Sequence, residues 1–329
     1  MTRLSVVIPT YARCASVRRA LDALGRQTLG PTEYEVVVAI DGSEDGTQQM
    51  VEQVAAPYAL RALFRPHGGR AAACNAGVRA ASGDLVVLLD DDMQPAPRFL
   101  AGHAEAHAGP EELGVMGAAP VPLDAQASPT ARYVAQKFNG HLENLARPDH
   151  QLHLRDFYTG NFSIRRATLL RVGLFDEAFT QYGNEDLELS VRLRRAGVRL
   201  VYAPEALAYQ TYTKDFAALA RDTVAKGRTA VLLANKHPET LRDLKLATYR
   251  EGFPRWRLAR SALLALSDRW PGTPQAVMCA VGGLERVVPQ RMLNVAYFLL
   301  LDYFYWLGAR QALRELSKTC SVYPARTST

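Results

Sequence analysis

One stretch, residues 83–95, constrains the fold more than any other part of the sequence. Residues 85–89 form a continuous apolar run between turn residues, which is typical of a parallel strand buried on both faces. Asp90, Asp91 and Asp92 follow directly. Three carboxylates at the end of a buried strand repel one another unless a cation neutralises them, and clustered carboxylate oxygens suit Mg²⁺ or Mn²⁺. A solvated acidic turn is the alternative for an isolated Asp triplet, so its position in the fold decides between the two.

Strands and helices alternate along the first ninety residues. Short apolar runs predict four strands, at residues 4–8, 35–40, 59–64 and 85–89. Helical patterns lie between them, at residues 16–24, 47–54 and 70–80. We expect Ser16 to cap the first helix. The alternation predicts a doubly wound, mostly parallel α/β sheet flanked by helices, in which ligands bind beyond the carboxyl ends of the strands. Thr10, Asp41 and Asp90 fall at that edge.

Two other patterns resemble metal sites. Residues 41–52 nearly fit a calcium-binding loop, with alternating acidic residues, Gly46 at the sixth position and Glu52 at the twelfth. A calcium loop of this type follows a helix, whereas residues 35–40 predict a strand, so calcium binding is not favoured. His103 and His107 share one helix face, but the HExxH glutamate is missing. We interpret these two histidines as part of a solvated face.

Five motifs, in order and at matching spacing, resemble glycosyltransferase family 2. They are VVIPTY at residues 6–11, DGS at 41–43, GGRAAACNAG at 68–77, LDDD at 89–92 and GNED at 183–186. The resemblance covers approximately residues 1–240. It implies the GT-A fold and an inverting, metal-dependent, hexosyltransferase-type enzyme. Such an enzyme uses a nucleotide-diphosphate sugar and Mg²⁺ or Mn²⁺, and the expected setting is the biosynthesis of cell-surface glycans such as polysaccharide, lipopolysaccharide or glycolipid.

The resemblance also assigns roles at the sheet edge. Asp41 would accept the N3–H of a uracil or guanine base, with Tyr11 lining the base pocket and Arg70 reaching the nucleotide. A carboxylate facing an imide N–H favours bases that carry this donor, which argues for UDP or GDP over ADP. Asp92 would be the principal metal ligand, and Asp90 would face the sugar and help to bind the metal. The implied nucleotide-sugar residues are Pro9, Thr10, Tyr11, Arg13, Asp41, Arg70, Asn75, Asp90 and Asp91.

The acidic pair Glu185 and Asp186 carries the chemistry in this resemblance. Asn184 is expected to cap a helix that runs to about Arg195 and ends at Gly197. Acidic residues in a first helical turn are favourable through the helix dipole alone, so a structural pair is the alternative. By resemblance, Asp186 is the general base that takes the acceptor hydroxyl proton in a single inverting displacement, and Glu185 orients the acceptor. A helix N-terminus keeps such a base ionised.

The acceptor side is less regular. Residues 119–156 contain four prolines and little periodicity, which predicts an irregular, substrate-facing connection. Tyr158, Gly160 and Asn161 resemble the strand that leads into the family's acceptor site. Gln210 departs from the family pattern, because many relatives have there a His that completes the metal shell. An amide oxygen is a poorer Mn²⁺ ligand than imidazole, so the metal preference stays open and weak metal dependence is an alternative.

The positive charge of the chain lies in its last quarter. Residues 254–329 hold ten Lys/Arg and four Asp/Glu, which accounts for the net charge of +6 of the 329 residues. The aromatic run at residues 292–307 is interrupted by Asn294 and Asp302 and falls short of the length that a membrane-spanning helix needs. We expect helices that pack against the catalytic domain, with a basic surface lying on anionic lipid, or an oligomer interface, as alternatives. Nucleic-acid binding is not favoured, because no binding module accompanies the charge.

The predicted organisation is a GT-A catalytic domain and a helical extension. The catalytic domain covers residues 1–240, with a nucleotide-sugar half (1–118) and an acceptor half (119–240), and the extension covers 241–329. Four scattered cysteines without a CxxC pair, and the absence of an apolar leader, predict a reduced, cytoplasmic chain, with peripheral contact at the inner face of a membrane as a further expectation. The cysteines are Cys14, Cys74, Cys279 and Cys320.

Two other functions, and a peptide in place of a glycan acceptor, remain as alternatives. An inactive scaffold that binds nucleotide sugars or lipid would need none of the catalytic carboxylates. A sugar nucleotidyltransferase should carry a Gly-rich, basic loop directly after the first strand, where residues 9–13 are PTYAR.

Overall fold

The computed structural model describes residues 3–322 and the side chains of residues 3–317. Within this range the chain forms two compact units. The first comprises the residues up to Ala125, Val134–Thr180 and Glu185–Thr213, and the second comprises Gln126–Tyr133, Gln181–Asn184 and the residues from Lys214 onward. The units divide the main chain at residue 213, whereas the predicted domains divide at residue 240, because the helix after residue 213 packs within the C-terminal unit.

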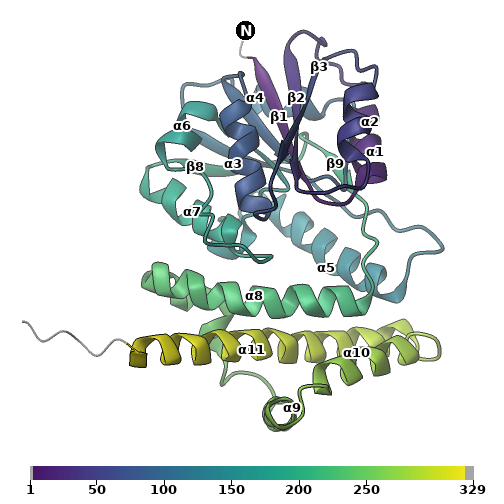
Figure 1. Ribbon diagram of the computed structural model, residues 1–329, viewed down its shortest axis with the longest axis vertical. Coiled ribbons are helices and arrows are strands. Elements are labelled where there is room, and N and C mark those ends of the chain that lie inside the picture. Colours follow the sequence, from purple (N-terminus) through teal and green to yellow (C-terminus); the bar gives the residue numbers. More distant parts are fainter. Residues whose placement is uncertain (1–2, 323–329) are drawn as a thin grey trace, which may run out of the picture. The chain divides into compact units, whose positions relative to one another are not determined.

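The first unit is built on a seven-stranded sheet within the described residues (Figure 1). Its strands are β1 (Leu4–Thr10), β2 (Tyr34–Asp41), β3 (Ala59–Arg65), β4 (Leu85–Leu89), β6 (Leu113–Gly117), β7 (Asn161–Arg165) and β8 (Arg199–Ala203). The strand order is β3-β2-β1-β4-β7-β6-β8, and β7 runs antiparallel to both of its neighbours while all other neighbours are parallel. The predicted doubly wound, mostly parallel sheet is therefore confirmed. Strand β2, not a helix, precedes residues 41–52, so the calcium-loop pattern lacks its helix.

A smaller antiparallel pair and several helices complete this unit. β5 (Met93–Pro95) pairs with β9 (Ala208–Gln210), which brings Gln210 opposite Met93. The helices are α1 (Cys14–Leu24), α2 (Thr47–Gln53), α3 (Arg70–Ala80), α4 (Phe99–Ala106), α6 (Arg166–Arg171) and α7 (Glu185–Arg195). The connection before β7 holds α5 (Pro129–Leu145), which belongs to this unit from Val134 onward, and the 3-10 turn η1 (Leu154–Asp156). Helices thus flank the sheet at the positions that the alternating pattern predicts.

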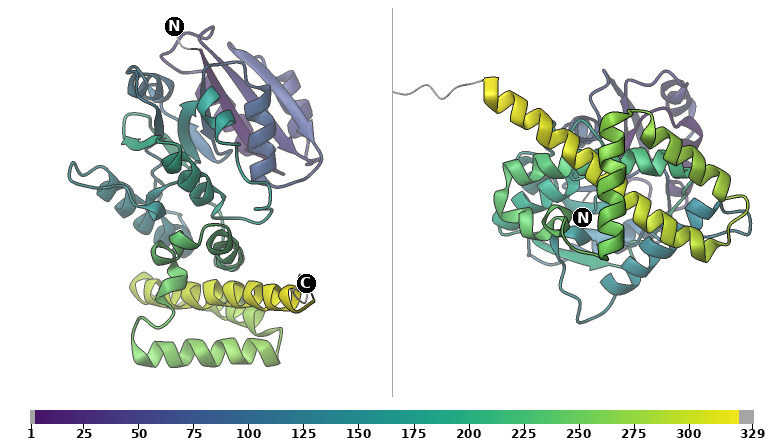
Figure 2. Two further views of the ribbon diagram at one scale, coloured as in Figure 1. Left: turned by 90° about the vertical axis from the view of Figure 1, so that its left-hand side faces the viewer. Right: turned by 90° about the horizontal axis from the view of Figure 1, so that it is seen from below.

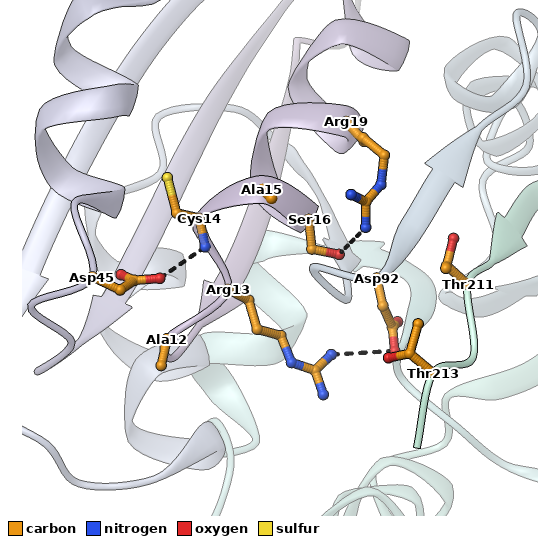
Figure 3. Close-up of a pocket in the computed structure, with 10 residues that line it drawn as sticks. All are labelled: Ala12, Arg13, Cys14, Ala15, Ser16, Arg19, Asp45, Asp92, Thr211 and Thr213. Carbon is orange, nitrogen blue, oxygen red and sulfur yellow. Dashed lines mark hydrogen bonds and ion pairs between the residues drawn. The ribbon is translucent and has the colours of Figure 1, made fainter. Parts of the chain in front are cut away.

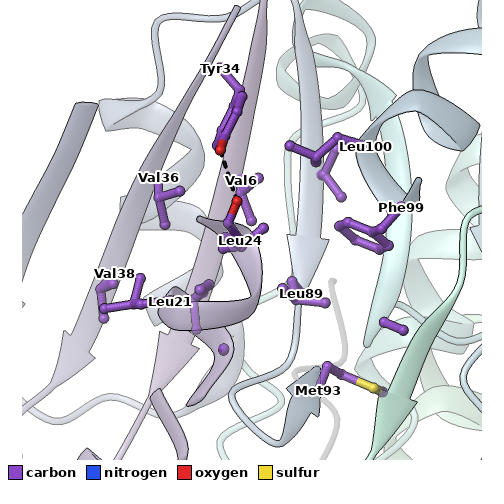
Figure 4. Packing of buried hydrophobic residues seen from close by; sticks show 14 of the residues in the cluster. Val6, Leu21, Leu24, Tyr34, Val36, Val38, Leu89, Met93, Phe99 and Leu100 are labelled. Carbon is purple, nitrogen blue, oxygen red and sulfur yellow. Dashed lines mark hydrogen bonds between the residues drawn. The ribbon is translucent and has the colours of Figure 1, made fainter. Parts of the chain in front are cut away.

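The core explains why the strands are continuous apolar runs. Helix α1 places Leu21 and Leu24 against the face of the sheet that carries Val6, Val36 and Leu89 (Figure 4). Other helices cover the opposite face, so both faces of the central strands lose contact with water. Burial of this apolar surface stabilises the fold by roughly 25 cal/mol per Å².

On the opposite face, helix α3 approaches the sheet very closely. A Cβ atom built on Gly77 would lie 2.3 Å from Cγ1 of Val7, so only glycine fits at this contact.

Helix α1 starts earlier than predicted, at Cys14, and Ser16 is not its cap. The carboxylate of Asp45 accepts the backbone N–H of Cys14 at 2.8 Å. A residue from another loop therefore satisfies an N-terminal amide of this helix, and local sequence carries no signal for such a partner.

The connection over residues 119–156 is not irregular, because it contains the 17-residue helix α5. Pro129 is the first residue of the helix, where a missing N–H costs nothing. Ala131, Ala135, Leu142 and Leu145 are buried at helical spacing. The prediction was wrong since it treated this proline as a helix breaker rather than as a helix start.

The second unit is a stack of helices (Figures 1 and 2). Its elements are α8 (Phe216–Lys236), the 3-10 turns η2 (Pro238–Asp243) and η3 (Lys245–Thr248), α9 (Pro254–Arg269), α10 (Thr273–Leu284) and α11 (Gln290–Val322). Asp215 caps α8, as its carboxylate accepts the N–H of Ala218 at 2.7 Å. Gly227 of α8 and Gly308 of α11 allow close packing, because a Cβ on either would lie about 2 Å from a carbonyl of the other helix.

Helix α11 is longer than the predicted run at residues 292–307. Its segment Gln290–Ser317, with a mean hydropathy of 1.2 and half of its most apolar window buried, is long and apolar enough to cross a membrane by length and composition. The expectation that the run was too short was wrong. Asp302 lies within this segment, and its carboxylate binds Arg260, Trp256 and Lys245 at 2.9 Å each. The acid that interrupts the apolar run is thus held by polar partners from α9 and η3.

The cysteines form no disulfide among the described side chains. Cys14, Cys74 and Cys279 are free thiols, and the side chain of Cys320 lies outside the described residues.

Candidate functional site

The carboxyl edge of the sheet gathers the predicted donor-site residues into two polar clusters. In the first cluster, the Thr10 hydroxyl donates to Oδ2 of Asp91 at 2.7 Å. Nη1 of Arg13 lies 3.0 Å from Oδ1 of Asp91 and 3.4 Å from Oδ2 of Asp92. The amide of Gln210 lies 3.4 Å from the same Asp92 oxygen. The Arg13 guanidinium therefore neutralises two carboxylates that directly follow β4.

Arg13 and Asp92 line a cavity of about 360 Å³ beside the start of α1 (Figure 3). Asp45, Thr211 and Thr213 contribute further polar groups to its wall. Its remaining lining residues are Ala12, Cys14, Ala15, Ser16 and Arg19. Two arginines, two aspartates and several hydroxyls make this cavity polar, and its two guanidinium groups are the part of the lining that can bind an anionic group.

Burial raises the pKa values of the carboxylates in this cluster. It raises the pKa of Asp91 to about 6, against the opposing effect of Arg13. The pKa of Asp92 is raised by burial and by the nearby charge of Asp90. Both carboxylates are thus costly to keep ionised unless a cation is close.

The residues around Asp92 fit a divalent ion that is shared with a ligand. Oδ1 of Asp92 is buried and has no hydrogen-bond partner among the described residues. No three His, Cys, Asp or Glu side chains converge as a metal site within residues 3–317. Mg²⁺ is usually held by one or two carboxylates together with substrate phosphates, so a single orphaned carboxylate oxygen beside the amide of Gln210 is compatible with such an ion.

Arg70, the first residue of α3, organises the second cluster. Its Nε and Nη2 donate to Oδ1 of Asp90 at 3.1 and 2.8 Å. Its Nη1 donates to the Thr159 hydroxyl at 3.1 Å and to Oδ1 of Asp186 at 3.2 Å, and lies 3.6 Å from Glu185. Thr159 in turn donates a hydrogen bond to Oδ1 of Asp186. One guanidinium therefore joins an acid predicted for the donor side to the predicted catalytic base.

The two members of the acidic pair differ in access. Glu185 is 4% exposed, and its Oε2 has no hydrogen-bond partner among the described residues. Burial and the adjacent charge of Asp186 raise the pKa of Glu185 to about 7. The side chain of Asp186 is 25% exposed, and its recorded polar contacts all fall on Oδ1. Asp186 is thus the carboxylate that a hydroxyl can reach.

Helix α7 begins at Glu185 and ends before Gly197, as predicted. The backbone of Asn184 is left-handed (φ 66°), and its side-chain amide donates to the carbonyl of Lys226 at 2.9 Å and to the hydroxyl of Thr229 at 2.8 Å.

The carboxylate of Asp41 is buried and accepts hydrogen bonds from several groups of the protein. Its carboxylate accepts the N–H groups of Gly68 and Gly69 at 2.9 and 2.8 Å, and it also pairs with Arg65 and with Nδ1 of His67. These four partners occupy the acceptor positions that the predicted base contact would use. The interstrand register pairs Asp41 with Arg65, but the sequence alone does not predict that register.

An exposed ring pair lies near this carboxylate. Tyr11 is 54% exposed, and its ring centroid lies 4.7 Å from that of His67. His67 was not predicted as a site residue, because only its position next to the Gly68–Gly69 turn marks it in the sequence. The two ring planes are tilted by 40° to one another, and the Tyr11 ring is open to solvent.

Two predicted contact residues lie beneath the site instead. Asn75 is 1% exposed, and its amide bonds both backbone groups of Phe175 at 2.9 Å. Asn161 is fully buried, and its amide donates to the carbonyls of Ala118 and Ala206 at 2.9 and 2.8 Å. Both side-chain amides bond backbone groups, so both residues position the backbone around the site.

The remaining predicted residues also shape the edge. Pro9 is buried within β1. The Tyr158 hydroxyl donates to the carbonyl of Gly117 at 2.6 Å. The carbonyl of Gly160 accepts the N–H of Asp90 at 2.8 Å, and a Cβ on Gly160 would lie 2.6 Å from Oδ2 of Asp90. Gly160 therefore allows the Asp90 carboxylate to sit where it does.

His103 and His107 are not a solvated face. Nε2 of His103 bonds the Asn161 side chain at 2.8 Å, and the Ser163 hydroxyl bridges Nδ1 of His103 and Nε2 of His107 at 2.8 and 2.9 Å. Burial lowers the pKa of His103 to about 3 and that of His107 to about 4. The interpretation was wrong because β7 presents Asn161 and Ser163, which lie on one face of the strand, to these two side chains.

Comparisons with known proteins agree on the fold and on one family. Residues 5–179 match the family model described as Glycosyl transferase family 2. Validoxylamine A glucosyltransferase of Streptomyces hygroscopicus subsp. limoneus is 29% identical, over 95% of this chain and 78% of its own length. The validoxylamine A glucosyltransferase of Streptomyces hygroscopicus subsp. jinggangensis (strain 5008) is 32% identical over 62% of this chain, which spans only 54% of that relative.

Two solved structures share the fold at low sequence identity. The mannosyltransferase PcManGT from Pyrobaculum calidifontis, in complex with GDP-Man and Mn²⁺, aligns with a TM-score of 0.61 and 22% identity, over 95% of this chain and 87% of its own. S. aureus TarS 1–349 aligns with a TM-score of 0.51 and 18% identity, over 95% of this chain and 91% of its own.

Proposed function

The chain belongs to glycosyltransferase family 2 and is a glycosyltransferase with the GT-A fold, and from this premise we propose that it is an inverting enzyme that uses a UDP- or GDP-sugar. The observation that carries the proposal is the position of Arg70, which binds Asp90 and Asp186 at once. Asp90 belongs to the DXD-type cluster after β4, and Asp186 to the acidic pair of α7. A donor-side acid and an accessible base thus share one cation.

The donor nucleotide is proposed to bind along the edge from Tyr11 to Asp92. The exposed Tyr11 ring beside His67 supports a stacking surface for the base. The cavity beside α1, with Arg13 and Arg19 in its wall, supports binding of the diphosphate. PcManGT is in complex with GDP-Man, and S. aureus TarS 1–349 has been solved in complex with UDP, so these relatives are compatible with either nucleotide.

A divalent ion, Mn²⁺ or Mg²⁺, is proposed as the cofactor. Asp92 would hold it, with support from Asp90 and from the amide oxygen of Gln210, because Oδ1 of Asp92 is buried without a partner in the described part of the chain. When bound, such an ion neutralises the negative charge that develops on the leaving diphosphate. Arg13, which already contacts Asp92, adds a second positive charge at this place.

Asp186 is the proposed general base. Arg70 and Thr159 hold its Oδ1, which leaves Oδ2 for the acceptor hydroxyl. As the acceptor oxygen forms its bond to the anomeric carbon, the proton passes to Asp186 and the bond from that carbon to the diphosphate breaks, with the electron pair leaving on the nucleotide. Glu185, which is buried beside Asp186, is proposed to orient the acceptor.

The proposed acceptor is a glycan or glycolipid hydroxyl in cell-surface glycan biosynthesis, with the enzyme in the cytoplasm at the inner face of the membrane. The support for this setting is the excess of positive charge in residues 254–329. Anionic lipids of the cytoplasmic leaflet attract basic surfaces.

The test combines nucleotide binding with transfer. Thermal stabilisation is measured with UDP, GDP, ADP and CMP, each with and without Mn²⁺ or Mg²⁺, because a ligand at 100 times its Kd stabilises the folded state by about 2.7 kcal/mol. We expect a shift with UDP or GDP that grows with metal. Asp92→Asn should lose the part of the thermal shift that depends on metal. Asp186→Asn should keep the full nucleotide-induced shift but should abolish sugar transfer.

A matched control removes an acid outside the site. Asp149→Asn, at a carboxylate that is 77% exposed, should change neither the shift nor transfer. If no nucleotide shifts the wild type, the donor site is refuted and a lipid-binding scaffold function is favoured. If Asp186→Asn loses nucleotide binding together with transfer, Asp186 is a structural residue and not the base.

A further inference from the structure

We propose that the outer face of helix α9 is a docking surface for anionic lipid. This face is defined by Leu258, Ala262, Ala265 and Leu266, and the exposed rings of Phe253 and Trp270 flank it at the two ends of the helix. The proposal rests on the proposed function for its setting at a membrane, but its argument uses only the C-terminal unit.

Contacts with α11 determine which face of α9 is turned toward that helix. Trp256 donates to Asp302 at 2.9 Å, and Arg260, which is 3% exposed, binds the same carboxylate at 2.9 Å. One turn further along, the Ser267 hydroxyl bonds the hydroxyl of Tyr303 at 2.6 Å. These three residues lie on one face at helical spacing, so the opposite face of α9 points away from α11.

That opposite face is apolar, although none of the described side chains in its own unit covers it. Leu258 is 74% exposed and Leu266 is 37% exposed, and the small residues between them are exposed as well. Phe253 and Trp270, at the two ends of the helix, are 80% and 60% exposed. An apolar stripe with aromatic residues at its ends is the pattern of a helix that lies in the membrane interface. Figures 1 and 2 show α9 as the outermost helix of its unit, across α11 from α8.

The charges of α9 are compatible with an anionic partner. Arg255, Arg257 and Arg269 are exposed, and none forms an ion pair with any described side chain. The one acid of the helix, Asp268, is engaged by Arg310 at 2.7 Å and by Arg314 at 2.5 Å. The surface therefore carries unneutralised positive charge next to exposed apolar side chains.

A second copy of the chain fits this face less well than lipid. In a two-fold dimer the same patch meets itself, so the arginines of one face would approach those of the other without an acid to neutralise them. Lipid head groups with a negative charge supply that neutralisation. Each Lys or Arg near such a surface strengthens partitioning by about fivefold.

The experiment is sedimentation of the full chain with vesicles. One set contains phosphatidylcholine alone, and the other contains phosphatidylcholine with phosphatidylglycerol. We expect binding to the anionic vesicles that weakens at high salt, because the attraction is screened. Replacing Arg255, Arg257 and Arg269 by Gln should lower partitioning on the order of 100-fold. The double variant Leu258→Glu/Trp270→Ser should lose binding to the anionic vesicles.

A matched control keeps the test specific. Leu170→Glu changes another exposed leucine, 38% exposed on α6, and should bind vesicles like the wild type. The thermal midpoint of every variant shows whether it folds. The nucleotide-induced shift should stay intact in the α9 variants, which separates failure of this proposal from failure of the proposed function.

Three results would overturn the proposal. The first is a wild type that does not sediment with anionic vesicles. The second is binding that the α9 variants leave unchanged. The third is a dimer in solution, seen by light scattering, that Leu258→Glu dissociates, since the face would then belong to a second copy of the chain.

Discussion

The two buried histidines under the site make the stability of the enzyme depend on pH. Burial lowers the pKa of His103 to about 3 and that of His107 to about 4. In the unfolded chain each titrates near its ordinary value of about 6.5. Below that pH the unfolded state binds protons that the folded state does not, so stability falls as the pH falls from about 6.5 towards the folded-state values.

The size of this effect follows from the difference in proton binding. At about pH 5.5, one unit below the unfolded pKa, each histidine lowers the free energy of unfolding by about 1.4 kcal/mol relative to about pH 7.5. Both side chains are almost fully buried, so solvent screens a charge on either imidazole very little. The pair should therefore remove about 3 kcal/mol, and each kcal/mol is equivalent to about 2–4 °C in the Tm of a unit of this size.

The assay is thermal unfolding at both pH values for the wild type and for a His103→Gln/His107→Gln variant. Glutamine keeps an amide for the hydrogen bonds of the histidines but does not titrate in this range. The variant should lose about 3 kcal/mol less than the wild type on acidification, whatever its stability at the higher pH. Acidic groups elsewhere titrate alike in both proteins and cancel in the comparison. Equal losses in the two proteins would refute the reasoning.

Two further predictions concern the polar clusters. Arg13→Gln removes the cation beside Asp92, so Mn²⁺ without nucleotide should raise the Tm of the variant more than that of the wild type; an unchanged or smaller rise would show that Arg13 does not compete with the metal. Thr159→Val removes the hydroxyl that holds Oδ1 of Asp186 and should lower kcat by about 10- to 100-fold, the effect of a lost hydrogen bond to a charged group, with nucleotide stabilisation unchanged. A normal kcat in Thr159→Val would mean that Arg70 alone positions the base.

Features that depend on the pattern along the chain could be predicted from the sequence. The central strands are recognisable because both faces of the sheet are covered, which requires continuous apolar runs. The edge that carries Thr10, Asp41 and Asp92 was predictable since the carboxyl ends of parallel strands meet there. Helix α3 was predicted with its observed bounds because its glycine turn and its small residues mark it locally.

Features that depend on a distant partner could not be predicted. The amide at the start of α1 is bonded by Asp45, so the hydroxyl of Ser16 is not needed there. Asn161 has the residue type of a ligand contact, but its amide is used by backbone carbonyls and by His103. Asp41 has the residue type of a base acceptor, but the backbone of the Gly68–Gly69 turn uses its oxygens. In each case the residue type indicated which hydrogen bonds the side chain can make, but the fold determined which partner makes them.

Arg70 shows how much of a site arises only from the fold. It is 20 residues from Asp90 and 116 from Asp186 in sequence, and the three come together because α3, the end of β4 and the start of α7 meet at one edge. The resemblance implies that Arg70 reaches the nucleotide, but the N–H groups that would do so now bind the two carboxylates. The same guanidinium thus lies between the donor-side acid and the accessible carboxylate, an arrangement that no local sequence pattern around Arg70 contains.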